Sequence, residues 1–235
     1  MNQSQEAKAP LRFLSYHKKT LVAREVHPLN DEQAAALLAA AKDTNVEYLL
    51  AVALFTGLRQ SELLGLTWDA IDFTAGVIRV NKQLARAAYR TEGPFQSPKS
   101  GKARTITPAP AVMAALRKQR ARQSETQLKA GPFWDNPYGL VFTTETGAPF
   151  NQRRADNGFH KALAAAGLSG FHFHSLRHTY AVNALRAGED IKTVQANLGH
   201  ATAAFTLDKY GHFTEQMARD SAARMERFIK GVLNL

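Results

Sequence analysis

Late in the chain lies the segment His174-Ser175-Leu176-Arg177-His178, followed by Leu198-Gly199-His200 and then by Tyr210. These stretches supply a guanidinium, several imidazoles and a phenol. Together, such groups can move a phosphoryl group through a covalent protein intermediate without a metal ion. The pattern therefore makes Tyr210 a candidate nucleophile.

A second polar cluster lies far upstream, in the segment Thr56-Gly57-Leu58-Arg59-Gln60-Ser61-Glu62-Leu63. The residues before it, 45–56, are apolar nearly all round, which predicts a buried helix that ends at Gly57. Arg59 follows this end directly, so we expect its side chain to emerge beside the core. Considered alone, Arg59 is best explained by an ion pair with Glu62.

With these two clusters the sequence resembles the tyrosine recombinase (phage integrase) family, from about Leu29 onward. The resemblance implies a mainly helical α+β fold, an integrase-type catalytic domain with a small antiparallel sheet on one edge. It also implies a site-specific DNA recombinase in which Tyr210 attacks the DNA, leaving a 3′-phosphotyrosine and a free 5′-hydroxyl. A second 5′-hydroxyl reverses this step, so no ATP, metal or other cofactor is expected.

The resemblance also assigns the residues that bind phosphate. Arg59 grips the scissile phosphate, and Glu62 orients that guanidinium or its helix. His174 and Arg177 are three residues apart, on one face near a helix N-terminus, where they would share one oxyanion. His200 contacts the phosphate or positions the nucleophile.

A lysine completes the set that the resemblance implies. Lys99 best matches the hairpin lysine that protonates the departing 5′ oxygen in the family, and Lys102 is the alternative. Considered alone, a hairpin lysine is usually solvated charge.

The second histidine of the late segment is interpreted differently. His178 stands about a third of a turn from Arg177, so we expect it to face the core in a structural rather than a chemical role. His174 and His178 also have the spacing of a zinc pair. The chain lacks the adjacent glutamate of the His-Glu-x-x-His motif, so no metal site is expected.

The composition of the chain indicates which partner and which compartment to expect. The chain has 235 residues, a formal net charge of +10 and a pI near 9.9, which favours double-stranded DNA as partner, although a merely solvated basic surface explains the charge equally well. It has no cysteine, which excludes disulfides and favours a reducing compartment, the cytoplasm. The longest apolar run, 49–55, is far below the ~20 residues of a membrane span, and no secretory signal is seen.

Three parts are expected along the chain. Residues 1–28 are polar and basic and predict an arm or linker, and residues 29–214 would form the catalytic domain. Residues 215–235 predict an amphipathic helix, which could equally pack on its own domain or, as the resemblance implies, be exchanged between protomers. A homotetramer on DNA and a monomer in solution would follow. Because family members usually carry a further N-terminal domain, a catalytic fragment or a short member is expected.

Local signals predict the elements. An Asn30–Gln33 capping box should open the first helix, and a small sheet should form near residue 70. Gly and Pro between residues 82 and 102 indicate a long loop. Further helices are expected at 34–42, 111–129, 152–166, 175–187, 191–198, 203–210 and 215–233, and strands at 68–73, 77–81, 104–107 and 139–142.

Two other functions stay open. A non-catalytic DNA-binding or regulatory module could keep the fold without cleaving DNA. A type IB topoisomerase shares much of the chemistry. The sequence leaves undecided the target site and the choice among integration, excision and dimer resolution.

Overall fold

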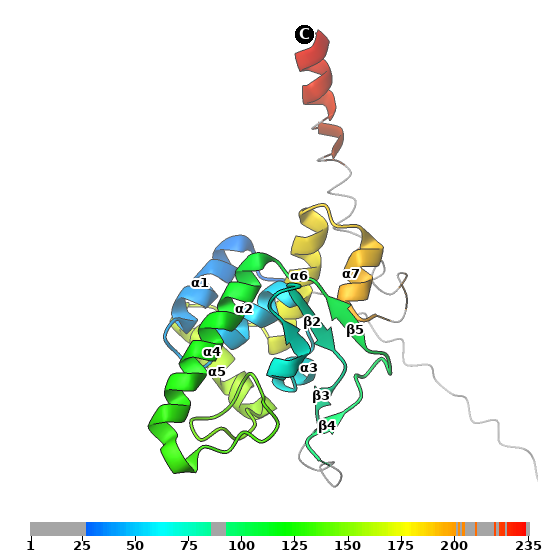
Figure 1. Cartoon of the computed structure of the whole chain (residues 1–235). Coiled ribbons are helices and arrows are strands. Elements are labelled where there is room, and N and C mark those ends of the chain that lie inside the picture. Colours follow the sequence, from blue (N-terminus) through cyan, green and yellow to red (C-terminus); the bar gives the residue numbers. More distant parts are fainter. Residues whose placement is uncertain are drawn as a thin grey trace, which may run out of the picture.

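The computed structural model describes residues 27–85 and 93–200, and beyond them residues 202, 204, 210, 219, 221–223 and 225–233. The fold is mainly helical, with small antiparallel sheets at one edge, as predicted (Figure 1). The helices are α1 Asp31–Ala41, α2 Glu47–Thr56, α3 Gln60–Leu64, α4 Pro110–Ala130, α5 Gln152–Ala165, α6 Phe173–Arg186 and α7 Ile191–Leu198. The strands are β1 Ile71–Asp72, β2 Val77–Val80, β3 Gln83–Leu84, β4 Phe95–Gln96 and β5 Arg104–Ile106.

Helix α2 is the centre of the hydrophobic core. It packs against α4 and against α6, which explains why its apolar residues lie all round the helix. It ends at Gly57 in the left-handed conformation, with φ 62°. A Cβ at Gly57 would lie 2.3 Å from Cδ1 of Tyr180 in α6, so glycine permits the close approach of these two helices. The predicted helix and its end are confirmed.

The predicted capping box is also confirmed. The Asn30 side chain accepts a hydrogen bond from the Gln33 backbone N–H at 2.8 Å, and the Gln33 side chain accepts one from the Asn30 N–H at 3.0 Å. These bonds satisfy two backbone donors at the start of α1. The backbone N–H of Leu29 donates to Thr179 Oγ1 at 2.9 Å, which joins the start of this helix to α6.

The three predicted strands pair in the order β1-β2-β5, all antiparallel. Ile78 of β2 lies opposite Ile71 on one side and Ile106 on the other, and all three side chains are buried. Residues 68–70, expected to begin the first strand, form a 3-10 turn instead. Strand β5 lies beside α7, so the sheet is held against the helix that precedes His200.

The prediction of a loop throughout residues 82–102 is wrong. Within the described part, β3 pairs with β4, with Gln83 opposite Gln96. Gln83 donates to the Ser97 carbonyl at 2.9 Å and accepts from Ser61 of α3 at 2.8 Å. These partners are distant in sequence, so the Gly and Pro signals of the segment could not reveal them.

The expected strand at 139–142 is reduced to a single bridge between Thr67 and Leu140. The segment is nevertheless buried, as its apolar residues suggested. Its backbone bonds to residues 66–68, with the Val141 N–H donating to the Leu66 carbonyl at 2.9 Å. The Gln123 amide adds bonds to the Leu140 carbonyl at 2.9 Å and to the Val141 carbonyl at 3.1 Å.

Residues 221–223 and 225–233 are helical and stand clear of the rest of the described chain (Figure 1). The apolar side chains of this helix are exposed, with Phe228 at 66% and Val232 at 61%. Of the helix expected at 203–210, residues 204 and 210 are helical, and most others lie outside the described residues, as does most of the expected arm. None of the described helices is both long and apolar enough to cross a membrane.

We expect Leu50→Ala to lower the free energy of unfolding by about 2–5 kcal/mol, because Leu50 is fully buried in α2 and its truncation leaves a cavity. Urea denaturation would measure the change. Leu128→Ala is the matched control, since that side chain on α4 is 83% exposed. Equal losses in the two variants would contradict the assignment of α2 as the core.

Candidate active site

Arg177 of α6 joins two helix ends. Its guanidinium donates to the Gly57 carbonyl at 2.7 Å and to the Leu198 carbonyl at 2.6 Å. These carbonyls lie at the C-termini of α2 and α7, where the helix dipoles place negative partial charge. Both helices end in a left-handed glycine, Gly57 and Gly199, which turns the chain away after the bonded carbonyls.

Burial makes the Arg177 charge costly. The residue is 3% exposed, and burial, followed by the positive charge of Arg59, lowers its pKa to about 9. Arg177 therefore remains protonated at neutral pH. A guanidinium has more N–H donors than the two bonds above use, so an added anion could be bound and would compensate this charge.

Arg59 lies against the same helix end. Its Nη1 donates to Glu62 Oε1 at 2.9 Å, and its Nη2 donates to the Gly199 carbonyl at 3.1 Å. The ion pair with Glu62 expected from the sequence is therefore present. The charges of Arg59 and Arg177 are close enough to influence one another, so the structure brings together the two predicted phosphate-binding arginines.

Arg104 is a member of this cluster that sequence reasoning missed. From β5 it donates to both carboxylate oxygens of Glu62, at 3.0 and 2.7 Å, and to the Asn197 carbonyl at 2.9 Å. Burial raises the pKa of Glu62, but the bonds and charges of Arg104 and Arg59 outweigh it, so the net pKa lies below the ordinary value. The only available signal was an arginine at the start of a predicted strand that ends in the core at Ile106.

His200 follows α7, in the turn after Gly199. Its backbone N–H donates to the Gln195 carbonyl at 3.1 Å, and its own carbonyl accepts from the Gln195 amide at 3.1 Å. Burial, followed by the charges of Arg177 and Arg59, lowers the pKa of the imidazole to about 3. His200 is therefore neutral in this structure and lies within reach of both arginine charges.

His174 is exposed in the first turn of α6, which begins at Phe173, two residues before the predicted start at residue 175. Its ring meets the ring of His178 edge to face, with 4.6 Å between the centroids. Its charge also acts on His200. His174 thus lies at the open side of the cluster that contains Arg177.

Tyr210 is buried, with 1% of its surface exposed, among residues of α6 and α7. Its hydroxyl lies 2.6 Å from Nδ1 of His178. Burial raises the pKa of this phenol to about 12, although the nearby charge of Arg177 opposes the shift. The candidate nucleophile is therefore protonated and covered in this structure.

The structure adds a partner to what the sequence indicated for His178. The sequence favoured a structural role facing the core, which stays a prediction, and the imidazole contacts the buried candidate nucleophile. The i, i+4 spacing of His174 and His178 was the signal that could have shown both rings on the same helix face.

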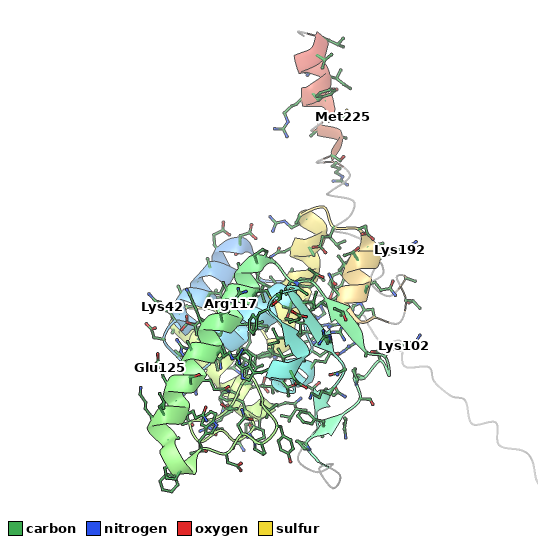
Figure 2. The ribbon with its side chains drawn as sticks, viewed as in Figure 1. Lys42, Lys102, Arg117, Glu125, Lys192 and Met225 are labelled. Atoms are coloured by element: carbon green, nitrogen blue, oxygen red, sulfur yellow. The ribbon has the colours of Figure 1, made fainter. Side chains whose placement is uncertain are left out.

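The structure does not bring the predicted lysine into contact with the arginine cluster. Lys99 and Lys102 are exposed on the segment between β4 and β5, and Figure 2 shows Lys102 at the outer edge of the molecule. Within the described part of the chain, neither ammonium forms a hydrogen bond or ion pair. The choice between these two lysines stays a prediction. Among the described residues, no three His, Cys, Asp or Glu side chains are grouped so that they could hold a metal ion.

We expect Arg104→Gln to lower the free energy of unfolding by about 3–5 kcal/mol, because it leaves the buried Glu62 carboxylate with only one arginine. Urea denaturation would measure this loss. Arg79→Gln, on the neighbouring strand, breaks a more exposed ion pair with Asp72 and should cost about 0–1 kcal/mol. Similar losses in both variants would contradict a special role for Arg104.

The free energy of unfolding should fall as pH drops from 6.5 toward 3. In this range an unfolded chain protonates His200, whose ordinary pKa is 6.5, whereas the folded chain keeps it neutral. Denaturation at a series of pH values would show a shallower slope in His200→Gln. His160→Gln, an exposed histidine on α5, should leave the slope unchanged. An unaltered slope in His200→Gln would contradict the depressed pKa.

Comparison with known proteins agrees with this geometry. The model of the phage integrase family matches residues 27–217. A tyrosine recombinase XerC-like protein of Caldanaerobacter subterraneus is 34% identical over 200 residues, which cover 80% of this chain and 51% of that protein. The transposase from transposon Tn916 of Enterococcus faecalis is 31% identical over 215 residues, 85% of this chain and 51% of that protein. The chain thus spans about half the length of these relatives.

Solved structures show the same fold. The Tn1549 transposon integrase in complex with a circular intermediate DNA matches with a TM-score of 0.69 and 27% identity, covering 88% of this chain and 67% of that one. The XerA recombinase matches with a TM-score of 0.66 and 24% identity, covering 86% of this chain and 65% of that one, and supports the fold alone.

Proposed function

Because the chain belongs to the phage integrase family, we propose that it is a site-specific recombinase that cleaves and rejoins double-stranded DNA through Tyr210. One observation carries the proposal. Residues from opposite ends of the domain, Arg59, Arg177 and His200, meet at the C-termini of α2 and α7, beside a cluster of side chains that contains Tyr210.

The charge of this cluster suits a phosphodiester. Three guanidiniums, those of Arg59, Arg104 and Arg177, surround the single carboxylate of Glu62. The described groups therefore carry surplus positive charge, which adds to the effect of burial in lowering the pKa of Arg177. A phosphodiester anion between Arg59 and Arg177 would accept charge-assisted hydrogen bonds, which strengthen as charge develops on phosphorus in the transition state.

The reaction that we propose conserves the number of ester bonds. The Tyr210 oxygen attacks the scissile phosphorus, forming a 3′-phosphotyrosine bond as the bond to the 5′ oxygen breaks. The phenol loses its proton and the departing 5′ oxygen gains one, for which Lys99 or Lys102 is the proposed donor. A 5′-hydroxyl from another strand reverses the step on a new partner, so the strands can be exchanged without an external energy source.

The structure without DNA would be a resting state. Tyr210 is covered and protonated, so it must be uncovered before it attacks. His174 is already exposed beside Arg177 and could meet the DNA first. We therefore propose that DNA binding at the arginines exposes Tyr210 while its contact with His178 is kept, which would protect other DNA from cleavage.

Assembly on DNA belongs to the same proposal. The exposed apolar side chains of residues 225–233 would be covered by a neighbouring protomer in a tetrameric complex, and the chain alone would be a monomer. Residues 29–214 would form the catalytic domain, preceded by a basic arm. The chain would act in the cytoplasm of a bacterium. Its substrate there would be bacterial DNA or phage DNA.

The test is capture of a covalent adduct. The chain is incubated with short nicked duplexes whose central sequence is randomised, and protein-linked DNA is isolated after denaturation in detergent. We expect an adduct that peptide mass spectrometry places on Tyr210 and that Tyr210→Phe abolishes, because a phenyl ring has no nucleophile. Tyr138→Phe, which alters an exposed tyrosine packed on Phe95, should retain the adduct.

The captured sequences decide among the related functions. A shared sequence supports a site-specific recombinase, whereas adducts without one, together with relaxation of supercoiled plasmid, indicate a topoisomerase. Salt-sensitive binding without any adduct indicates a non-catalytic DNA-binding module. An adduct that persists in Tyr210→Phe contradicts the assignment of the nucleophile.

A further inference from the structure

The hydroxyl of Tyr210 and Nδ1 of His178 are 2.6 Å apart, a short distance for a hydrogen bond that involves nitrogen. The two residues are 32 positions apart in sequence, so the contact arises from the tertiary fold. Their ring planes are tilted by 59°, with 5.9 Å between centroids. The contact is a hydrogen bond between the phenol and the imidazole, rather than ring stacking, and the phenol is its donor when the imidazole carries its hydrogen on Nε2.

Other groups near Tyr210 are less suited to remove its proton. Arg177 is a donor only. His200 is bonded through its backbone to Gln195, and burial together with the charges of Arg177 and Arg59 lowers its pKa to about 3, so it is a weak base. His174 is exposed and meets His178 through its ring, with 4.6 Å between centroids.

We propose that His178 is the general base that accepts the proton of Tyr210, an inference that rests on the proposed function. The O–H bond of Tyr210 breaks as the bond from its oxygen to phosphorus forms, and the proton moves to Nδ1 of His178. For this step the imidazole must be neutral, with its own hydrogen on Nε2. In rejoining, the proton returns from Nδ1 to the phenol oxygen as the phosphotyrosine bond breaks.

The surrounding charges favour this role. The described ionisable groups around His178 are His174 and Arg177 on α6, His200 after α7, and Tyr210. Arg177 carries a positive charge that acts on Tyr210, the partner of His178 in this bond. Once DNA is bound, the phosphate would offset this positive charge and stabilise the imidazolium formed when the phenol loses its proton.

The first test is the rate of adduct formation by His178→Gln on the duplexes captured by the native chain. Loss of a general base should slow this step on the order of 10²-fold. Thermal melting and duplex binding are measured in parallel to exclude misfolding. His160→Gln is the matched control, because that imidazole is exposed on α5 and contacts the Asp156 carbonyl.

A fluorinated tyrosine at position 210 separates a chemical role from a structural one. Its phenol ionises at lower pH, so it depends less on a base, and it should recover most of the rate that His178→Gln loses. A loss of equal size with tyrosine and fluorotyrosine would overturn the proposal, because a displaced nucleophile is not restored by greater acidity. A faster rate in His178→Gln would also overturn it, since His178 would then only hold Tyr210 in place.

The native chain offers a second measurement should His178→Gln fail to fold. Below the pKa of the accepting imidazole the rate falls, and this limb should stay at the same pH when Tyr210 is fluorinated. A limb that moves with the acidity of the phenol would mean that free phenolate attacks, and would refute the role of His178. If the limb moves in this way but Tyr210→Phe still abolishes the adduct, only the role of His178 is refuted and the proposed function stands. If the native chain forms no adduct, both proposals fall.

Discussion

The guanidinium of Arg177 fixes the relation between two helix ends on which the rest of the site depends. It holds the last carbonyls of α2 and α7 at hydrogen-bond distance, although Gly57 and Leu198 belong to opposite ends of the domain. A charged group buried to this extent is costly unless its partners are well placed. The helix dipoles supply such partners without a carboxylate, so the positive charge stays available to an incoming anion.

Glu62 partly neutralises the positive charge of this cluster and holds two of its guanidiniums in place. Its two oxygens are bonded by Arg104, and one of them also by Arg59, so the side chains of α3 and β5 are held together through one carboxylate. Arg104 further contacts the Asn197 carbonyl at the end of α7. The sheet therefore stabilises the helix end that precedes His200, which gives the small strands a role in the site beyond completing the core.

The sequence predicted the parts of the fold that depend on local signals. The box at Asn30 and the glycine end of α2 were predictable because capping and left-handed glycine involve neighbouring residues. The pairing of β3 with β4 was missed because its support comes from Ser61 and from partners across a turn. Likewise, the segment at Leu140 has the apolar residues of a strand, but its partners are the distant residues 66–68 and a glutamine side chain from α4.

The sequence predicted those site residues that lie in recognisable motifs. Arg59 and Arg177 do converge, whereas the roles of Arg104 and His178 appear only when distant elements are packed together. No periodicity could show that an arginine of β5 would meet a carboxylate of α3. Lys99 is the opposite case. A motif match grouped it with the predicted site residues, whereas in the structure it lies on an exposed segment.

The contacts that define the proposed phosphate-binding centre join distant parts of the sequence. Arg177 meets Gly57 across 120 positions, and Arg59 meets Gly199 across 140. A chain emerging from the ribosome therefore lacks this centre until its last helices have been synthesised and packed. A nascent or truncated chain could bind DNA through its surface charge, yet it would have no complete pocket of arginines. The long separation would thus prevent the proposed DNA cleavage during synthesis of the chain.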